Sequence, residues 1–309
     1  MERFNPSCQQ FLRAGLLTGV ALAASPAFAQ TPRRIIVDSQ MHLWRANSPE
    51  RPWTPGSRPQ TPEPMTYERA LAMMDDAGVD RLVIVPPSLE GVRVDYGQEA
   101  ARRHPGRFAT MGRVALDDPL IEAKMATWRN QPAVLGVRLN IGAEQLRQLN
   151  NGAAKHLWPA AEKAGVPIMF LASGHMPLFA KIAERHPQLT LIVDHMGISA
   201  ETMHAGKTAE TVAETAALAR YPNVSVKLSS IPLFSKEDYP WRDVMPHVRR
   251  LFDVYGPRRS HWGTDATNSF DKAAYRQRVT QFTEQIDFMS ADDMDWVMGR
   301  SILERLCWT

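Results

Sequence analysis

The sequence contains little cysteine, no large excess of charge of either sign, and no long apolar run beyond its first thirty residues. Two cysteines in 309 residues exclude a small disulfide-stapled scaffold, so burial of apolar side chains must stabilise the fold. Lys and Arg total 36 against 33 Asp and Glu, which excludes the basic field typical of nucleic-acid-binding proteins. No later stretch reaches the roughly 18 apolar residues of a membrane span, so we expect no membrane anchor.

The first 29 residues have the pattern of an export signal. Arg3 and Arg13 precede an apolar run over residues 14–24, and residues 27–29 (Ala-Phe-Ala) form the small-x-small pattern that a signal peptidase recognises. Cleavage after Ala29 predicts a periplasmic or secreted protein. The signal is either of the Sec type or a degenerate twin-arginine signal in which both arginines are replaced. An N-terminal helix that caps the fold is the alternative.

Short apolar runs alternate with helical patterns along residues 30–309. Strand-helix-strand units at this interval predict a parallel sheet, and eight of them close into a barrel. No glycine-rich phosphate motif follows any run, which disfavours a doubly wound open sheet. We therefore expect an α/β protein with a signal peptide over residues 1–29 and one (β/α)8 TIM barrel domain over residues 30–309. The expected strands are residues 35–38, 82–85, 108–114, 135–139, 167–171, 190–194, 224–228 and 261–263.

Apolar residues at helical spacing predict the helices between and after these strands. Two of them follow the eighth strand, and we expect both to pack on the outside of the barrel. The expected helices are residues 67–77, 96–104, 119–128, 157–164, 178–185, 210–220, 244–255, 273–287 and 292–306.

Residues 47–64 interrupt this alternation with six prolines, a composition that suits neither a helix nor a central strand. The segment follows the first strand, so in a barrel it would lie over the catalytic face. It is either a lid that brings Trp53 or an arginine to the substrate, or a passive ordered loop.

Polar residues at the carboxyl ends of the strands are the candidates for chemistry, because the reacting groups of a βα barrel gather there. Asp38, Gln40 and His42 are two residues apart, so a pleated strand points all three to one side. His42 alone would be interpreted as a structural histidine, but polar groups at other strand ends favour a shared site. These further candidates are Arg138, His175, His195, Lys227 and Asp265.

The order of these residues resembles the amidohydrolase superfamily. Residues 38–42 (Asp-Ser-Gln-Met-His) resemble its strand-one Asp-x-His-x-His, and residues 194–197 (Asp-His-Met-Gly) its strand-six Asp-His-x-Gly. Residues 263–265 (Gly-Thr-Asp) are similar to the Gly-Ser/Thr-Asp that ends strand eight there. Segments 223–229 and 255–259 resemble the branch that contains L-fuconolactonase, sulfomuconolactonase and pyrone dicarboxylate lactonase. The resemblance implies a distorted βα barrel.

The same resemblance implies an exported hydrolase of a small cyclic ester, a lactone, or of a related carbonyl compound. Asp265 would be the general base, because a carboxylate can accept a proton as water attacks the carbonyl carbon. His42 and His195 would polarise the carbonyl oxygen, where negative charge develops. Arg138 has the planar fork that suits a substrate carboxylate, with a salt bridge at the barrel rim as the alternative.

Further contacts to a small, carboxylate-bearing substrate are expected from Gln40, Lys227, His175 and Trp53. Gln40 stands where the family has the first histidine of its metal pair, and a carboxamide is a poorer zinc ligand than imidazole. We therefore favour a reaction that requires no cofactor. The weak candidate ligands for a divalent metal such as zinc are Asp38, His42, His175, His195 and Asp265.

Two other functions stay open at the level of sequence. A nonoxidative decarboxylase of an aromatic acid belongs to the same superfamily, but such enzymes usually rely on the strand-one histidine pair, and Gln40 counts against it. A catalytically silent barrel that binds a small ligand would explain Gln40, but it has no need of Asp265 as a base.

Overall fold

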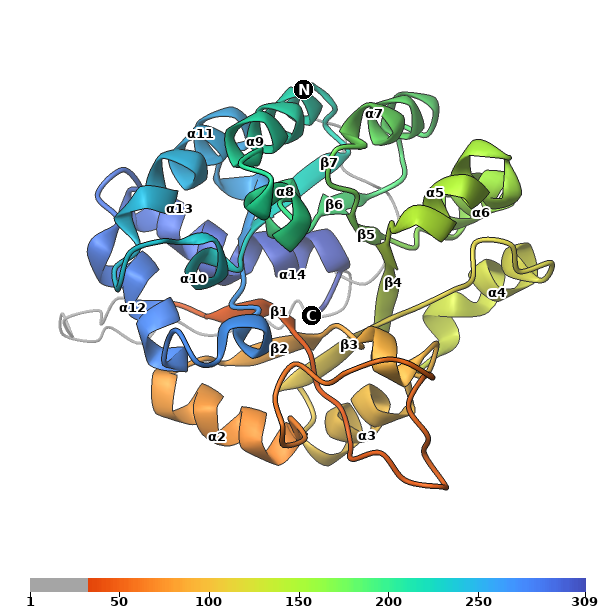
Figure 1. Ribbon diagram of the computed structural model, residues 1–309, viewed down its shortest axis with the longest axis horizontal. Helices are drawn as coiled ribbons and strands as arrows, with labels where there is room; N and C mark the ends of the chain where they lie inside the picture. Colours follow the sequence, from red (N-terminus) through yellow and green to blue (C-terminus); the bar gives the residue numbers. More distant parts are fainter. Residues whose placement is uncertain (1–32) are drawn as a thin grey trace, which may run out of the picture. The chain divides into compact units, whose positions relative to one another are not determined.

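The computed structural model describes residues 33–309, and the predicted export signal over residues 1–29 lies outside them. The described chain forms one sheet of eight parallel strands in sequential order, as expected for a (β/α)8 barrel (Figure 1). The expected strands are all present, with ends that differ by a few residues. They are β1 (Val37–Met41), β2 (Arg81–Ile84), β3 (Phe108–Gly112), β4 (Val134–Asn140), β5 (Ile168–Leu171), β6 (Leu191–Val193), β7 (Val224–Leu228) and β8 (Ser260–Trp262).

Helices surround the strands, and α2 and α6 have the bounds that were predicted. The ends of α2 show why. It begins after Thr66, whose side chain accepts a hydrogen bond from the Arg69 amide, and ends at Gly78 with φ +74°. The short helices α5, α8 and α10 were not predicted. The helices are α2 (Tyr67–Ala77), α3 (Asp95–Arg103), α4 (Ile121–Thr127), α5 (Ala143–Asn150), α6 (Leu157–Ala164), α7 (Met176–Arg185), α8 (Ala200–His204), α9 (Thr208–Ala217), α10 (Ile231–Phe234), α11 (Met245–Tyr255), α12 (Tyr275–Gln285), α13 (Ala291–Asp295) and α14 (Ser301–Leu306).

Successive strand residues point to opposite faces, so the strands contribute to two apolar cores. Leu82 and Ile84 of β2 pack in the larger core with the helices, whereas Val83 packs in a smaller core inside the barrel. Ile302 and Leu306 of α14 join that inner core. Figure 1 shows α14 near the centre of the ring of helices, so the expectation that it packs on the outside is wrong. Its apolar face instead closes one end of the barrel.

The seam between β8 and β1 is closed by individual hydrogen bonds in place of a strand ladder. Asp38 Oδ1 accepts from the Thr264 amide at 2.8 Å, and Asp38 Oδ2 accepts from Thr264 Oγ1 at 2.6 Å and from the Tyr275 hydroxyl at 2.9 Å. The Asp265 amide donates to the Gln40 carbonyl at 2.7 Å. Asp38 is therefore a structural residue of the seam, and the same bonds fix the position of Asp265.

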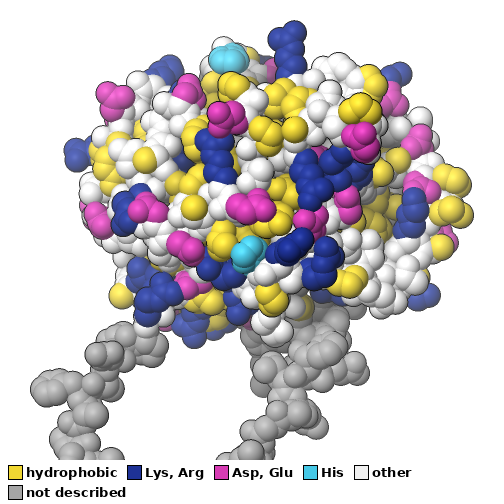
Figure 2. Space-filling model, turned by 90° about the horizontal axis from the view of Figure 1, so that it is seen from below, with side chains coloured by type: hydrophobic (Ala, Val, Ile, Leu, Met, Phe, Trp, Pro, Cys, Tyr) yellow, Lys and Arg dark blue, Asp and Glu magenta, His cyan; other side chains and the backbone are white. Residues whose placement is uncertain are grey.

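The surface agrees with the small net charge. Figure 2 shows Lys and Arg side chains lying among Asp and Glu side chains on the face seen from below. Among residues 33–309, we find no helix with both the length and the apolar character needed to cross a membrane.

Candidate active site

A cavity of ≈ 250 Å³ lies where the carboxyl ends of the strands meet. Four residues predicted from the sequence line it, namely His42, Arg138, His195 and Asp265. The side chains that line it without having been predicted include Gln60, Asn140, Ser199, Ser230 and Asn268. The signal that could have found several of them is position, because Asn140 ends β4, Ser230 follows β7 by two residues and Asn268 follows Asp265 by three.

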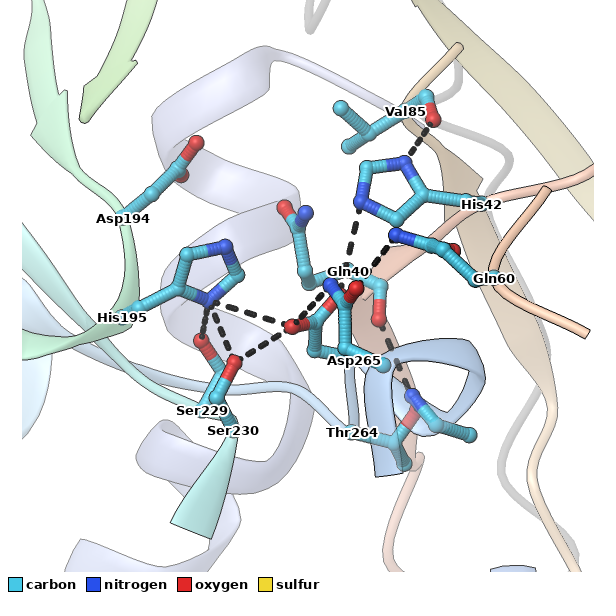
Figure 3. Close-up of polar contacts among 12 residues, drawn as sticks. Gln40, His42, Gln60, Val85, Asp194, His195, Ser229, Ser230, Thr264 and Asp265 are labelled. Carbon is cyan, nitrogen blue, oxygen red and sulfur yellow. Dashed lines mark hydrogen bonds and ion pairs between the residues drawn. The ribbon is translucent and has the colours of Figure 1, made fainter. Parts of the chain in front are cut away.

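Asp265 lies at the centre of this site and is only 1 % exposed. Its Oδ2 atom accepts hydrogen bonds from Ser230 Oγ at 2.5 Å and from Asn268 Nδ2 at 2.7 Å (Figure 3). Its Oδ1 atom is buried, accepts no hydrogen bond from the described residues, and lies 3.4 Å from His42 Nε2. One carboxylate oxygen is thus held in place by two donors while the other stays open to accept a proton.

The Asp265 carboxyl is ionised at neutral pH. Burial alone would raise its pKa, but the positive charge of His195 and His42 in their protonated forms and the hydrogen bonds from Ser230 and Asn268 bring the pKa below its ordinary value. A proton acceptor with this environment keeps its basic form across the neutral range.

His42 faces Asp265 as a second proton acceptor. Its Nδ1 lies 2.6 Å from the Val85 carbonyl oxygen, which can only accept, so Nδ1 carries the hydrogen. Burial lowers the pKa of His42 to about 4 against the opposing effect of Asp265, so the ring is neutral and Nε2 has no proton. The resemblance assigned His42 to polarise a carbonyl oxygen, which requires a donor. On the side that faces Asp265, the neutral ring offers an acceptor and no donor.

His195 is held by two serine hydroxyls. Its Nδ1 lies 2.9 Å from Ser229 Oγ and 2.8 Å from Ser230 Oγ. The Ser230 hydrogen is directed to the charged Asp265 carboxylate, so the Ser230 oxygen can accept from Nδ1, whereas the Ser229 hydroxyl can donate to Nδ1 or accept from it. Burial lowers the pKa of His195, and Nε2 is the ring nitrogen directed away from the serines in Figure 3.

The backbone of the site is strained at three linked residues. His195, Ser230 and Asp265 have φ values of 53°, 63° and 48°, in the left-handed region that non-glycine residues rarely adopt. Each such residue costs about 1–3 kcal/mol, and such strain gathers at functional sites where the surrounding structure enforces it. Here the three strained residues are joined through the Ser230 hydroxyl.

A buried chain of charges supports the floor of the cavity. Asp194 Oδ1 lies 3.0 Å from Lys227 Nζ, and Asp194 Oδ2 accepts from Arg138 Nε at 3.2 Å. Burial would raise the pKa of Asp194, but these two cations lower it to about 2. The two terminal nitrogens of Arg138 make no hydrogen bond with any described residue. Arg138 therefore combines both predicted roles, a salt bridge and a donor face left available to a substrate.

The other predicted substrate contacts do not line the cavity. Gln40 and Lys227 are fully buried and bind each other, with Lys227 Nζ 2.7 Å from Gln40 Oε1. Trp53 donates from its indole nitrogen to the Arg45 carbonyl at 3.0 Å, and His175 precedes α7 away from the cavity lining. The proline-rich segment contributes Arg58 and Gln60 to the lining in place of Trp53.

Of the weak candidate metal ligands, His42, His195 and Asp265 line the cavity, whereas Asp38 and His175 do not. Within the described residues, no group of three or more His, Cys, Asp or Glu side chains could hold a metal ion. Both oxygens of Asp38 accept hydrogen bonds in the seam, and His195 Nδ1 faces two serines. Among these candidates within residues 33–309, the two atoms that face each other with lone pairs available to a metal are His42 Nε2 and Asp265 Oδ1, 3.4 Å apart. Zinc sites use three or four protein ligands, so these residues do not fit a firmly bound zinc.

A known protein family matches the part of the chain that contains both the barrel and the cavity. The family model described as Amidohydrolase matches residues 37–300, which includes all eight strands and every residue of the cavity discussed above. The chain belongs to the amidohydrolase family. It is therefore an enzyme of the amidohydrolase superfamily, as the motifs in β1, β6 and β8 predicted.

Two curated relatives of this amidohydrolase are lactone hydrolases. The chain is 28% identical over 218 residues to 4-sulfomuconolactone hydrolase of Hydrogenophaga intermedia, an alignment that covers 69% of each chain. It is 25% identical over 242 residues to L-fucono-1,5-lactonase of Burkholderia ambifaria, covering 74% of this chain and 79% of the relative.

Solved structures share the fold of this amidohydrolase at lower identity. An amidohydrolase of Burkholderia multivorans with bound zinc superposes with a TM-score of 0.74 at 17% identity, covering 88% of this chain and 99% of the other. A 5-carboxyvanillate decarboxylase of Sphingomonas paucimobilis superposes with a TM-score of 0.63 at 15% identity, covering 90% of this chain and all of the other.

Proposed function

We propose that this amidohydrolase hydrolyses a small cyclic ester, a lactone, with Asp265 as the general base. The observation that carries the proposal is the pair formed by Asp265 Oδ1 and His42 Nε2, which face each other at 3.4 Å, while His42 Nδ1 is directed to the Val85 carbonyl. Both atoms belong to residues that line the cavity. A pair of acceptors in this position is suited to take a proton from a water molecule.

In the proposed reaction, Asp265 Oδ1 removes a proton from water as the water oxygen attacks the lactone carbonyl carbon. The proton then lies between Asp265 and His42, which removes the unfavourable contact of two acceptors. In the tautomer that has its hydrogen on Nε2, with Ser229 donating to Nδ1, His195 donates to the carbonyl oxygen as it becomes negative. When the ring C–O bond breaks, the proton held by the pair passes to the alcohol oxygen, and the product is an open hydroxy acid.

The substrate of this proposal carries a carboxylate. The two terminal nitrogens of Arg138 have no partner among the described residues. Arg58 also lines the cavity, and it makes no ion pair with any described residue. Guanidinium groups bind carboxylates through two parallel hydrogen bonds, which fixes the orientation of the bound molecule. The named relatives act on 4-sulfomuconolactone and L-fucono-1,5-lactone, and the first of these names describes an acidic lactone.

A nonoxidative decarboxylase is the second candidate, favoured by the shared fold with 5-carboxyvanillate decarboxylase. A panel of acidic and sugar lactones and of aromatic acids separates the two. We expect ring opening, followed as acid release at constant pH, and no release of carbon dioxide. Carbon dioxide release from an aromatic acid without opening of any lactone would reverse this assignment.

We also propose that residues 1–29 are removed on export, which leaves the barrel as the single mature domain. The proposal rests on the small-x-small pattern at residues 27–29 after an apolar run. Mass spectrometry of the protein isolated from the periplasm or the medium is expected to find Gln30 as the first residue. A chain that keeps Met1 and stays in the cytoplasm would contradict it.

A further inference from the structure

The proline-rich segment of residues 47–64 is attached to the barrel mainly through its first half. Arg51 Nη2 donates to Glu90 Oε2 at 2.5 Å, and Arg51 Nη1 donates to Asp95 Oδ2 at 2.6 Å. The Thr54 amide donates to the Leu89 carbonyl at 2.9 Å. These contacts hold one end of the segment to the connection after β2 and to the start of α3.

The second half of the segment makes few bonds. Over residues 55–62 only one hydrogen bond reaches the rest of the described chain, from Gln60 Nε2 to Asn268 Oδ1 at 2.5 Å. Ser57 and Thr61 bond only to carbonyls within the segment. The three prolines of this stretch have no amide hydrogen to donate. Gln60 is thus the single polar latch between this half of the segment and the catalytic face.

The latch ends on a residue that touches the proposed base. Asn268 accepts from Gln60 through Oδ1 and donates through Nδ2 to Asp265 Oδ2 at 2.7 Å. An amide group has one acceptor end and one donor end, so the bond from Gln60 and the bond to Asp265 require the same orientation of Asn268 and support each other. Figure 3 shows that Gln60 and Asp265 belong to different segments of the chain and that the Gln60 side chain points toward Asp265.

We propose that Gln60 is a positioning residue, which orients the Asn268 amide so that its NH2 group holds Asp265 for proton transfer. The inference rests on the proposed role of Asp265 as the base. Attachment of residues 55–62 to the catalytic face and orientation of Asp265 are then coupled, because the Asn268 side-chain amide takes part in both. Arg58 lies two residues from Gln60 and lines the same cavity, so the latched segment also carries a substrate contact.

The test compares three variants by kcat and KM on the lactone that the wild type opens fastest. Gln60→Ala removes the donor and is expected to lower kcat by about tenfold, and any rise in KM through Arg58 comes in addition to that loss. Gln60→Glu has the same shape but can only accept, so it draws the Asn268 NH2 group away from Asp265. We expect this variant to lose more kcat than Gln60→Ala. Thr61→Ala is the matched control on the same segment and is expected to match the wild type.

A double-mutant cycle shows whether Gln60 acts through Asn268. In an Asn268→Ala background, Gln60→Ala is expected to have no further effect on kcat. Additive effects, a change confined to KM, or Gln60→Glu with wild-type kcat would each overturn the role of Gln60. A wild type that opens no lactone would overturn the proposed function instead. In that case, amide hydrogen exchange of residues 54–64 tests the contact between Gln60 and Asn268. Exchange is expected to be faster in Gln60→Ala than in the wild type and unchanged in Thr61→Ala. Equal exchange in the two variants would overturn the contact.

Discussion

An Asp265→Asn variant is expected to lose lactone hydrolysis by about 10³-fold in kcat, within the range of 10²–10⁴ that a general base contributes. The carboxamide keeps the shape of the side chain and its oxygen still accepts from Ser230 and Asn268. Asparagine also tolerates the left-handed backbone of this position, where φ is 48°. What it removes is the atom that accepts the proton from water. Initial rates at saturating lactone measure the loss.

The same variant is expected to unfold at a temperature equal to or above that of the wild type. In the wild type, two proton acceptors face each other at 3.4 Å. The carboxamide NH2 group can donate to His42 Nε2 and relieve that contact, which illustrates how active sites give up stability for function. Asp253→Asn, at an exposed carboxylate, is the matched control and should keep wild-type kcat. Wild-type turnover by Asp265→Asn would contradict the assignment of the base, and unfolding of that variant would contradict the account of its environment.

An Asp194→Asn variant is expected to lose about 3–5 kcal/mol of unfolding free energy, because it leaves two buried cations without their counter-ion. Lys227 Nζ lies 3.0 Å from one oxygen of Asp194, and Arg138 Nε lies 3.2 Å from the other. Lys227 has no exposed surface, so water cannot replace the lost charge. Denaturant unfolding at neutral pH measures the effect.

The pH dependence of stability provides a check on the same group. The pKa of Asp194 is lowered from 3.8 to about 2 in the folded protein. Its charged form therefore stabilises the fold above about pH 4, by about 2 kcal/mol, and this contribution is lost as the pH falls toward 2. Between pH 4 and pH 2, the free energy of unfolding of Asp194→Asn should fall less than that of the wild type. Asp118→Asn, which removes an exposed pair with Lys124, is the control and should cost less than about 1 kcal/mol. An equally small effect at Asp194 would contradict the charge chain.

The fold was predictable because the strands are continuous apolar runs. Leu82 to Ile84 shows this best, since its side chains fill the outer and inner cores in turn. The first strand was placed too early because Asp38, Ser39 and Gln40 are polar. They are nonetheless fully buried in β1, where bonds from Thr264, Tyr275 and Lys227 satisfy Asp38 and Gln40. Such tertiary partners leave no local pattern in the sequence.

The candidate site was predictable only where a residue ends a strand. His42, Arg138, His195 and Asp265 were found by that rule, and the cavity brings them together. The proton position on His42 depends on the carbonyl of Val85, which is 43 residues away, and so has no signature in the motif. Gln60 was not predicted for a related reason, because its partner Asn268 lies 208 residues away in the sequence.

The most direct test of the central claim is the rate of lactone opening by the wild-type protein after exhaustive treatment with a chelator. Metal content is determined on the same sample by elemental analysis. The Asp265 and His42 pair predicts that kcat stays within about twofold of the untreated value while zinc falls well below one atom per chain. Loss of turnover on chelation, with recovery in proportion to one added zinc per chain, would contradict the account.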